Sequence, residues 1–503
     1  MSPPAQPSTP DTSTRLALWL PPAVLAAVLL ATASRYGLHR DELYFIACAH
    51  HLSWGYPDQG PLTPLIAAAM TALAPGSSWA LRLPSALAAA LTVRLAGRTA
   101  QELGGQHRGQ LLAECVTAVA SIVLVTGHLL NTSTFDLLVW TGALWLAVRA
   151  VLREQPRTWL WVGLVIGIGL LNKPLPAFLA AAICLSIAIS GPRQLLRTAW
   201  FWAGAVAAAG LAVPFIWWQA AHGWPQLTVS RAIAHGGSTS SQPGWAVLPF
   251  QLLLVSPVLA PVWIAGLLAL FRRPEWRAVR FVGWTWLVLA VVFTAAGGKP
   301  YYLAGMLPVL VAAGAVRCEA WLAASPVRAG AARYRAGLLY TAIALSAVVC
   351  SIIGLPVLPA SQAGPVVAVN PDAGETIGWP AFAATVAGVT QQVGEPGTVV
   401  FTRNYGEAGA LQYYRHRAGL PARIFSGHNG YGTWGPPPPG AVPVVVVGYS
   451  PDAAGRWFTG CAVRTHFHDP AGIDNEENGV AILVCRGPRT SWAAEWDQLR
   501  HLN

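Results

Sequence analysis

Charged side chains are scarce in this sequence. Only 11% of its 503 residues are Asp, Glu, Lys or Arg, whereas a soluble domain carries about 25%. Lysine is rarer still, because Lys173 and Lys299 are the only two in the chain. At the same time 54% of the residues are hydrophobic, which is more than a water-exposed fold can bury. The composition therefore excludes a soluble enzyme, a disordered chain and a fibrous repeat.

In place of charge the sequence has a series of apolar runs, each about as long as a helix that crosses a bilayer. Such a helix needs about 20 apolar residues, so the chain holds material for about ten or more. Breaks between the runs predict an all-α polytopic membrane bundle of eleven spans over residues 15–358. The expected spans lie near 15–34, 79–98, 111–127, 135–152, 158–172, 174–190, 198–219, 245–271, 279–297, 301–322 and 336–357. Residues 1–14 are predicted to form a disordered cytoplasmic tail, and no cleavable signal peptide is expected.

The basic side chains are distributed unevenly. Residues 1–359 carry 23 basic and 10 acidic side chains, whereas residues 360–503 carry 9 and 11, so the net charge of +11 resides in the membrane part. Arginines cluster in the connections on the side of the N-terminus, among them Arg149, Arg153, Arg157, Arg193, Arg197, Arg272, Arg273, Arg277 and Arg280. The positive-inside rule makes this side cytoplasmic. We therefore expect a multi-pass protein of the plasma (inner) membrane with its C-terminal part outside, and no nucleic-acid partner.

Residues 359–503 follow a different pattern. Residues 398–403, 442–449 and 480–485 are predicted to be buried strands, with short helices at 408–415 and 453–458 between them. This alternation favours an extracytoplasmic α/β domain with a mostly parallel sheet. Cys461 and Cys485 both lie in this domain, where an oxidising compartment favours a disulfide. The alternative is a pair of free buried thiols.

The first outward loop, residues 35–78, concentrates ionisable side chains. It contains His39-Arg40-Asp41-Glu42, then His50-His51, and then Gly55-Tyr56-Pro57-Asp58-Gln59-Gly60-Pro61-Leu62. Adjacent carboxylates flanked by Arg and His at a membrane mouth could support general-base catalysis. The alternative is a solvated amphipathic segment with ordinary interfacial charges.

These motifs resemble the polyprenyl-phosphate-dependent glycosyltransferases of the GT-C fold, and more narrowly the group of protein mannosyltransferases and aminoarabinose transferases. The resemblance continues in family order through Ala80-Leu81-Arg82-Leu83-Pro84-Ser85, Leu171-Asn172-Lys173-Pro174 and Gly298-Lys299-Pro300-Tyr301-Tyr302-Leu303, and covers residues 15–322. It implies an inverting transfer of a sugar from a polyprenyl-phosphate donor at the outer membrane face. The acceptor would be an envelope lipid, glycan or protein.

The resemblance also implies roles for single residues. Asp41 would be the general base, Glu42 would orient Asp41, a substrate hydroxyl or a metal, and Asp136 would hold the acceptor or the base. The donor phosphate needs cations at the interface, and the candidates are Lys173, Lys299, Arg40, Arg82 and Arg231, with Tyr302 as a hydrogen-bond donor. The alternative for each cation is snorkelling to the interface, and for Asp136 a favourable helix N-terminal position.

Further residues are weaker candidates for the acceptor site, because aromatic, amide and imidazole groups suit sugar stacking and hydroxyl binding. They are Asp58, His51, His428, Asn429 and Trp434, together with the segment Asn404-Tyr405-Gly406-Glu407-Ala408-Gly409, which follows a predicted strand. For the candidates in residues 359–503, the alternative that they simply form the edge of a turn-rich loop is equally good. His50, His51 and Asp58 could assist a divalent metal, but nothing in the sequence defines a ligand geometry, so the cofactor stays open.

The rival function is a transporter or flippase for a lipid-linked glycan. A transporter often shows paired half repeats or interrupted helices, neither of which is visible in the sequence. The ionisable residues also cluster at one membrane mouth rather than near mid-membrane. The sequence does not specify the sugar, the acceptor, the isoprenoid length or the oligomeric state.

Overall fold

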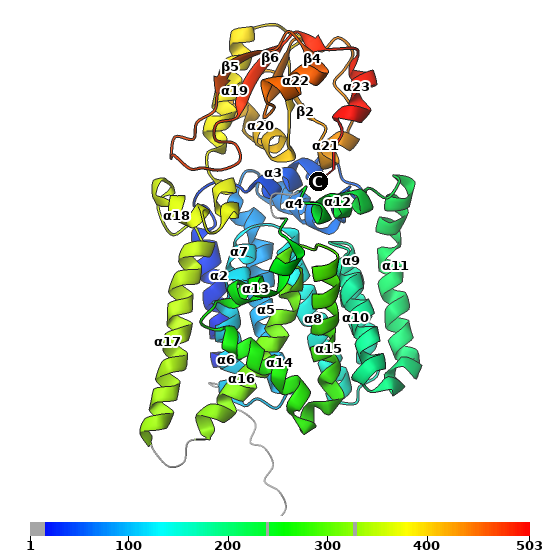
Figure 1. Cartoon of the computed structure of the whole chain (residues 1–503), viewed down its shortest axis with the longest axis vertical. Coiled ribbons are helices and arrows are strands. Elements are labelled where there is room, and N and C mark those ends of the chain that lie inside the picture. Colours follow the sequence, from blue (N-terminus) through cyan, green and yellow to red (C-terminus); the bar gives the residue numbers. More distant parts are fainter. Residues whose placement is uncertain (1–15, 238–240, 325–328, 503) are drawn as a thin grey trace, which may run out of the picture.

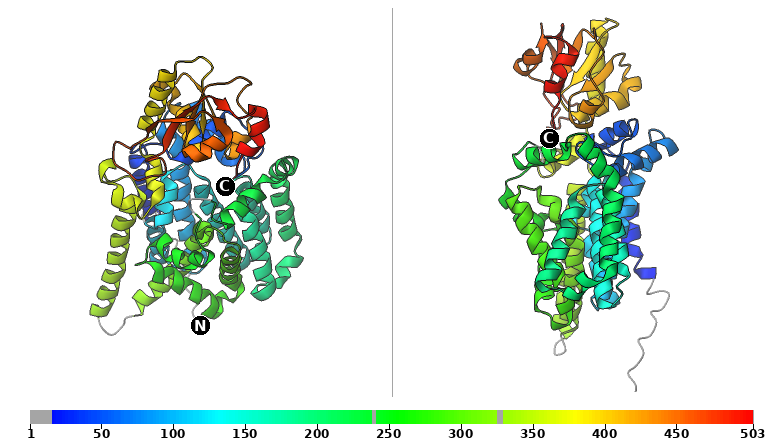
Figure 2. Two further views of the ribbon diagram at one scale, coloured as in Figure 1. Left: turned by 45° about the horizontal axis from the view of Figure 1, so that its top comes forward. Right: turned by 90° about the vertical axis from the view of Figure 1, so that its right-hand side faces the viewer.

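The computed structural model describes residues 16–237, 241–324 and 329–502. Its helices form a bundle, and a smaller outer domain built on a sheet lies over one end of that bundle (Figures 1 and 2). This arrangement confirms the predicted fold class, a helical membrane part followed by an α/β domain. The expected tail at residues 1–14 lies outside the described residues.

Each predicted span contains a helix, but the helices differ in length. Among the described residues, five segments are long and apolar enough to cross a membrane: Thr132–Leu152 (α8), Ala199–Ala221 (α11), Pro274–Ala295 (with α15, Arg280–Ala295), Pro300–Ala323 (with α16, Leu307–Ala323) and Ala331–Gly354 (within α17, Ala329–Gly354). Two bent pairs raise this number to seven: His107–Ala118 (α6) with Ser121–His128 (α7), bent by 59°, and Gly244–Val255 (with α13, Val247–Val255) with Ala260–Arg272 (α14), bent by 115°. The second break falls at Ser256-Pro257, where proline removes a backbone donor.

The remaining predicted spans are shorter or carry charge. Three short helices, of 13, 13 and 16 residues, are α2 (Leu20–Thr32), α9 (Thr158–Leu170) and α10 (Leu175–Ser190). A fourth, α5 (Ser78–Glu102), has 25 residues but contains Arg82 and Arg94, which are buried inside the bundle. The chain is therefore a multi-pass membrane protein, while the count of about eleven spans stays a prediction.

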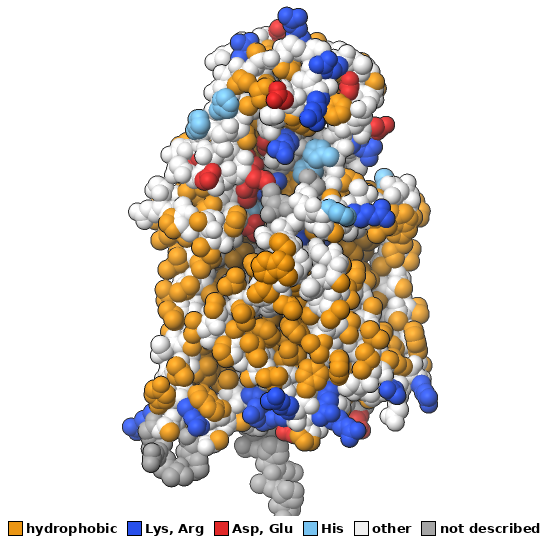
Figure 3. Space-filling model, viewed as in Figure 1, with side chains coloured by type: hydrophobic (Ala, Val, Ile, Leu, Met, Phe, Trp, Pro, Cys, Tyr) orange, Lys and Arg blue, Asp and Glu red, His pale blue; other side chains and the backbone are white. Residues whose placement is uncertain are grey.

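The surface of the bundle is apolar around its flanks. Figure 3 shows hydrophobic side chains over this face of the bundle, and basic side chains along the rim opposite the outer domain. Large exposed apolar side chains on the helices include Trp161, Val206, Trp217 and Val291. A soluble monomer rarely exposes so large a continuous apolar surface. We therefore take this band as the surface that contacts lipid.

The outer domain contains a mixed five-stranded sheet in the order β2-β1-β3-β6-β5. Its strands are β1 (Val399–Thr402), β2 (Arg423–Ser426), β3 (Val444–Val447), β5 (Ala462–His466) and β6 (Ala481–Cys485). β1 pairs in parallel with β2 and β3, but β6 is antiparallel to both β3 and β5, so the expectation of a mostly parallel sheet is wrong for half of the pairings. The reason is the connection: α20 (Tyr405–Ala418) provides a crossover between β1 and β2, whereas residues 467–480 join β5 to β6 without a helix.

Both faces of this sheet are covered. On one face Val445 and Val447 join a core formed with α19 (Trp379–Val393) and α20. On the other face Val444 and Val446 pack with α23 (Trp492–Leu499). The first core also includes Leu43 from α3 (Arg40–Ala49) in the first outward loop. The outer domain and that loop therefore share one hydrophobic core, which places their side chains over the same end of the bundle.

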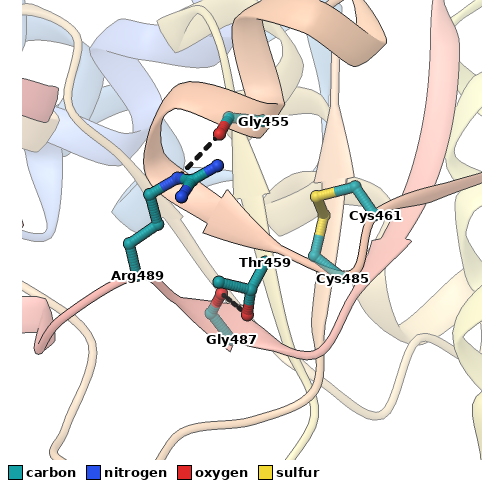
Figure 4. Close-up of a disulfide and its surroundings, with 6 residues drawn as sticks. All are labelled: Gly455, Thr459, Cys461, Cys485, Gly487 and Arg489. Carbon is teal, nitrogen blue, oxygen red and sulfur yellow. Dashed lines mark hydrogen bonds between the residues drawn. A yellow bond between two sulfur atoms is a disulfide. The ribbon is translucent and has the colours of Figure 1, made fainter.

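The two outer-domain cysteines are joined. Cys461, just before β5, and Cys485, at the end of β6, form the disulfide that the sequence predicts (Figure 4). Close to it, the Nε of Arg489 donates a hydrogen bond of 2.8 Å to the carbonyl oxygen of Gly455. These links tie the last strands of the domain together.

Candidate active site

A cavity of about 380 Å³ lies where the outer ends of the helices meet the first outward loop and the outer domain. Its polar lining comes mostly from loops and the outer domain: His39, Arg40, Asp41, Asp58, Lys173, Lys299, Asp372, Glu375, Tyr405 and Asn429. Its apolar lining comes from α7, α10, α15 and α12 (Pro225–Ala234): Val125, Leu175, Phe178, Val229, Ile233 and Phe293. A cavity with charged and apolar walls suits an amphiphilic molecule.

Asp41 lies in the first turn of α3. The helix begins there because His39 caps it: its Nδ1 accepts a hydrogen bond from the Asp41 backbone N–H at 3.1 Å. On the cavity side the Tyr405 hydroxyl donates to Oδ1 of Asp41 at 2.8 Å. Burial tends to raise the pKa of Asp41, but electrostatic interactions with His39 and Arg40 and the Tyr405 hydrogen bond hold it below its usual value. The carboxylate is therefore ionised at neutral pH and able to accept a proton.

Glu42 points away from the cavity and is fully buried. Its Oε1 and Oε2 accept hydrogen bonds from Nε and Nη2 of Arg82 at 2.8 and 2.7 Å. The backbone N–H groups of His39 and Leu130 donate to the same carboxylate. Neither Glu42 nor Arg82 lines the cavity. The geometry therefore does not support a contact of Glu42 with substrate or of Arg82 with the donor phosphate. The pair instead links α3 to α5 inside the protein.

The two lysines lie in turns at the end of the bundle that carries the outer domain, and both line the cavity. Lys173 follows α9, and its Nζ donates to Oγ of Ser133 at 3.1 Å and lies 5.6 Å from the centre of the Tyr301 ring. Lys299 precedes the segment Pro300–Met306. Burial, reinforced by the charge of Lys173, lowers the pKa of Lys299 to about 8, although Asp41 favours its protonated form.

The other predicted phosphate ligands divide into two groups. Arg40 and Tyr302 line the cavity, and the Tyr302 ring packs edge to face on Phe293. The Arg40 guanidinium is already engaged, since it contacts Glu476. Arg231 is exposed on α12 and is not among the lining residues. The lysines and Tyr302 thus remain the better-placed candidates for a phosphate.

Asp58 is brought close to the outer domain. The Tyr44 hydroxyl donates to its Oδ1 at 3.0 Å, and the Asn429 amide lies 3.4 Å from its Oδ2. Burial raises the pKa of Asp58 to about 6, an effect that these two hydrogen bonds partly offset. Asp58 and Asn429, both predicted for the acceptor, therefore meet in the cavity beside Asp41.

The remaining predicted residues lie outside this cavity. Asp136 is buried in α8, where Nε1 of Trp140 donates to it at 3.2 Å. His428 packs against the Tyr405 ring, with ring centres 4.8 Å apart. His51 and Trp434 stack at 4.2 Å and line a second, polar cavity of about 370 Å³. These residues are not brought together with Asp41.

Tyr405 and Tyr44 also contribute to the site; Tyr405 lies in a segment predicted for the acceptor, whereas Tyr44 was not predicted. Tyr405 begins α20, shortly after the end of β1, and Asn429 comes shortly after the end of β2. Both strands are parallel, and ligands bind beyond the carboxyl ends of parallel strands. The sequence contained this information, because Tyr405 and Asn429 each follow an apolar segment of the kind that forms a strand.

A cluster of carboxylates borders the cavity and also escaped prediction. Ligand atoms of Glu375, Glu476 and Glu477 lie within 4.8 Å of one another. Burial, together with the neighbouring carboxylates, raises the pKa of both Glu375 and Glu477 to about 8. Among the described residues, this cluster is where metal-ligand side chains converge, and His50, His51 and Asp58 do not belong to it.

Residues 58–218 match the family model of dolichyl-phosphate-mannose-protein mannosyltransferases. The fold is similar to that of ArnT from Cupriavidus metallidurans in the apo state, with 15% identity, 94% of this chain and 98% of that chain covered, and a TM-score of 0.59. A structure of ArnT from Cupriavidus metallidurans bound to undecaprenyl phosphate matches with the same identity and coverage and a TM-score of 0.58. Curated protein sequences contain no significant match.

A more distant structure has a related fold. It is the Archaeoglobus fulgidus oligosaccharyltransferase tethered with an acceptor peptide, at 13% identity, 82% of this chain and 64% of that chain, and a TM-score of 0.50. The segment matched by the family model contains Asp58, Arg82, Asp136 and Lys173 of the predicted motifs. The resemblance predicted from the sequence is thus confirmed: the chain has the GT-C fold of the membrane glycosyltransferases.

Proposed function

We propose that this protein transfers a sugar from a polyprenyl-phosphate donor to an envelope lipid, glycan or protein at the outer face of the plasma membrane. The proposal depends on one observation, which is that the cavity has both charged and apolar walls. It places Asp41 and two lysines beside an apolar wall made by membrane helices. The family model over residues 58–218 and the undecaprenyl phosphate bound to ArnT agree with such a donor.

The donor fits this cavity in one orientation. Its isoprenoid chain lies along the apolar side chains of α7, α10 and α15, and its phosphate lies at Lys173 and Lys299. Two ammonium groups balance the charge that develops as the polyprenyl phosphate leaves. The Tyr302 hydroxyl is placed in the same cavity to donate a hydrogen bond.

Transfer then needs a base for the acceptor. Asp41 takes the proton from the acceptor hydroxyl, whose oxygen attacks the anomeric carbon of the sugar. The bond from that carbon to the phosphate oxygen breaks, and the phosphate leaves with the bonding electrons. Because attack and departure occur on opposite faces, the anomeric configuration inverts. Asp58 and Asn429 would bind acceptor hydroxyl groups, a role supported by their contact with each other in the wall of the cavity.

Sugar transfer by purified protein in nanodiscs tests the base. Asp41→Asn keeps the shape of the side chain but cannot accept the proton, so turnover should fall by about 100- to 10,000-fold while donor binding is retained. The matched control is Asp452→Asn, an exposed carboxylate on the outer domain, which should transfer at the normal rate.

Near-normal turnover of well-folded Asp41→Asn protein would contradict the base assignment. If Lys299→Ala also transferred sugar normally, this cavity would not be the active site, and lipid-linked glycan transport would become the better reading. Mass spectrometry of envelope glycolipids and glycoproteins from a deletion strain identifies the sugar and its acceptor.

A further inference from the structure

Three carboxylates converge beside the cavity, at the junction of two chain segments. Glu375 lies in the segment Pro371–Thr376, which connects the membrane part to the outer domain. Glu476 and Glu477 lie in the loop of residues 467–480 between β5 and β6. One oxygen of each carboxylate lies within 4.8 Å of the others. Of the three, Glu375 lines the cavity, and the proposed transfer assigns none of them a chemical role.

The cluster differs from solvated surface acids in its burial. Glu375 and Glu477 are 7% and 2% exposed. Among the described residues, neither carboxylate oxygen of Glu477 has a hydrogen-bond partner of ordinary geometry. A buried carboxylate is costly in its ionised form, so the oxygens of Glu477 are expected to bind either a proton or a ligand that supplies positive charge.

One cation is already present, but it does not balance the cluster. Nη1 of Arg40 contacts Oε2 of Glu476 and lies 3.6 Å from Oε2 of Glu375. When all three carboxylates are ionised, a single guanidinium leaves two negative charges unbalanced. A divalent ion supplies the charge that is missing.

We propose that Glu375, Glu476 and Glu477 bind a divalent cation of the calcium type. Ligands that are all oxygen select a hard ion over zinc or copper. Calcium–oxygen distances of about 2.3–2.6 Å place two ligand oxygens at most about 5 Å apart. The ligand oxygens of the cluster all lie within 4.8 Å of one another, which is compatible with this spacing. Water completes the coordination shell.

The position of the ion links it to the proposed base. The Arg40 guanidinium lies 5.1 Å from the centre of the Tyr405 ring, and the Tyr405 hydroxyl donates to Asp41. The two loops are also joined directly, because the Asn475 amide donates to the carbonyl oxygens of Gly374 and Ile377 at 3.2 Å. A bound ion therefore fixes the outer domain against the start of α3, and its carboxylates are positioning residues for the cavity.

Calcium binding by the full chain tests this site without an activity assay. The protein is placed in nanodiscs of zwitterionic lipid, so that the lipid does not bind calcium, and is stripped with a chelator. Isothermal titration with calcium chloride should show one site with a dissociation constant of about 1 mM or tighter. The unfolding temperature should rise with calcium concentration, because the ion binds the folded state.

Variants locate the ion. Glu477→Gln keeps the volume and removes the charge, and it should weaken calcium binding by at least about tenfold. Glu476→Gln does the same at an exposed member of the cluster and keeps the test valid if Glu477→Gln fails to fold. Glu395→Gln, at an exposed site elsewhere in the domain, should bind calcium as the unmodified protein does. Absence of calcium binding up to several millimolar, or normal binding by both cluster variants, would overturn the proposal.

Discussion

At the scale of single residues, two adjacent carboxylates on α3 have opposite surroundings. Successive side chains on a helix are rotated by about 100°, so Asp41 and Glu42 cannot face the same partner. Asp41 is partly exposed to the cavity, whereas Glu42 is fully buried against Arg82. One is free to take a proton from a substrate, and the other holds the start of the helix in place.

Lys299 gives the donor site a pH dependence. With a pKa of about 8, its ammonium is charged below that pH and neutral above it. A neutral amine attracts phosphate less, so the donor KM should rise up to about tenfold per pH unit above pH 8. Donor KM measured between pH 6.5 and 9.5 checks this, with the lipid composition held constant.

Lys299→Arg is the matched variant for that measurement. Arginine stays protonated over the whole range, so its donor KM should not rise in the alkaline limb. An alkaline rise that survives in Lys299→Arg protein would assign the effect to another group.

At the scale of elements, the Glu42–Arg82 pair connects α3 to α5. Removing one partner leaves a charge buried and unpaired, so Arg82→Ala should reduce the free energy of unfolding by about 3–5 kcal/mol. Denaturation of the purified protein in detergent, followed by tryptophan fluorescence, measures the change. Arg456→Ala, at an exposed position on the outer domain, should leave the stability unchanged. Arg82→Ala protein that is stable but binds donor poorly would restore Arg82 as a phosphate ligand.

The sequence predicted those features that depend on the residues of a single helix or turn. The apolar runs located the helices, and the turns holding Lys173 and Lys299 followed from their boundaries. It failed where a partner comes from elsewhere in the chain. Nothing near Arg82 indicates that Glu42 will bind it, because the pair is separated by 40 positions and forms only when α3 docks on α5.

At the scale of the whole molecule, the arginine-rich connections lie at the end of the bundle opposite the outer domain (Figure 3). By the positive-inside rule, reporters fused after Arg153 and after Arg273 should therefore read cytoplasmic. A reporter fused after the C-terminal residue should read extracytoplasmic, because the outer domain lies at the other end (Figure 1). A cytoplasmic reading there would place the cavity on the wrong side of the membrane for an envelope acceptor.

The cavity as a whole was only partly predictable. Its membrane half follows motifs in chain order, and that half contains Asp41, Lys173 and Lys299 as expected. Its other half includes Tyr405 and Glu375, whose positions depend on how the outer domain packs against the bundle. This packing is determined by the hydrophobic core that α3 and α20 share, and no short segment of the sequence predicts that contact.

The contact between Asp41 and Tyr405 joins residues 364 positions apart, and this separation bears on how the protein matures. During synthesis Asp41 emerges early, long before the ribosome reaches Tyr405. The cavity therefore cannot be assembled until the outer domain has also been made and has folded onto the bundle. A nascent chain stalled within the bundle would hold the two lysines and Asp41 without the wall that orients them, so under the proposed function unfinished copies in the membrane would not consume a lipid donor.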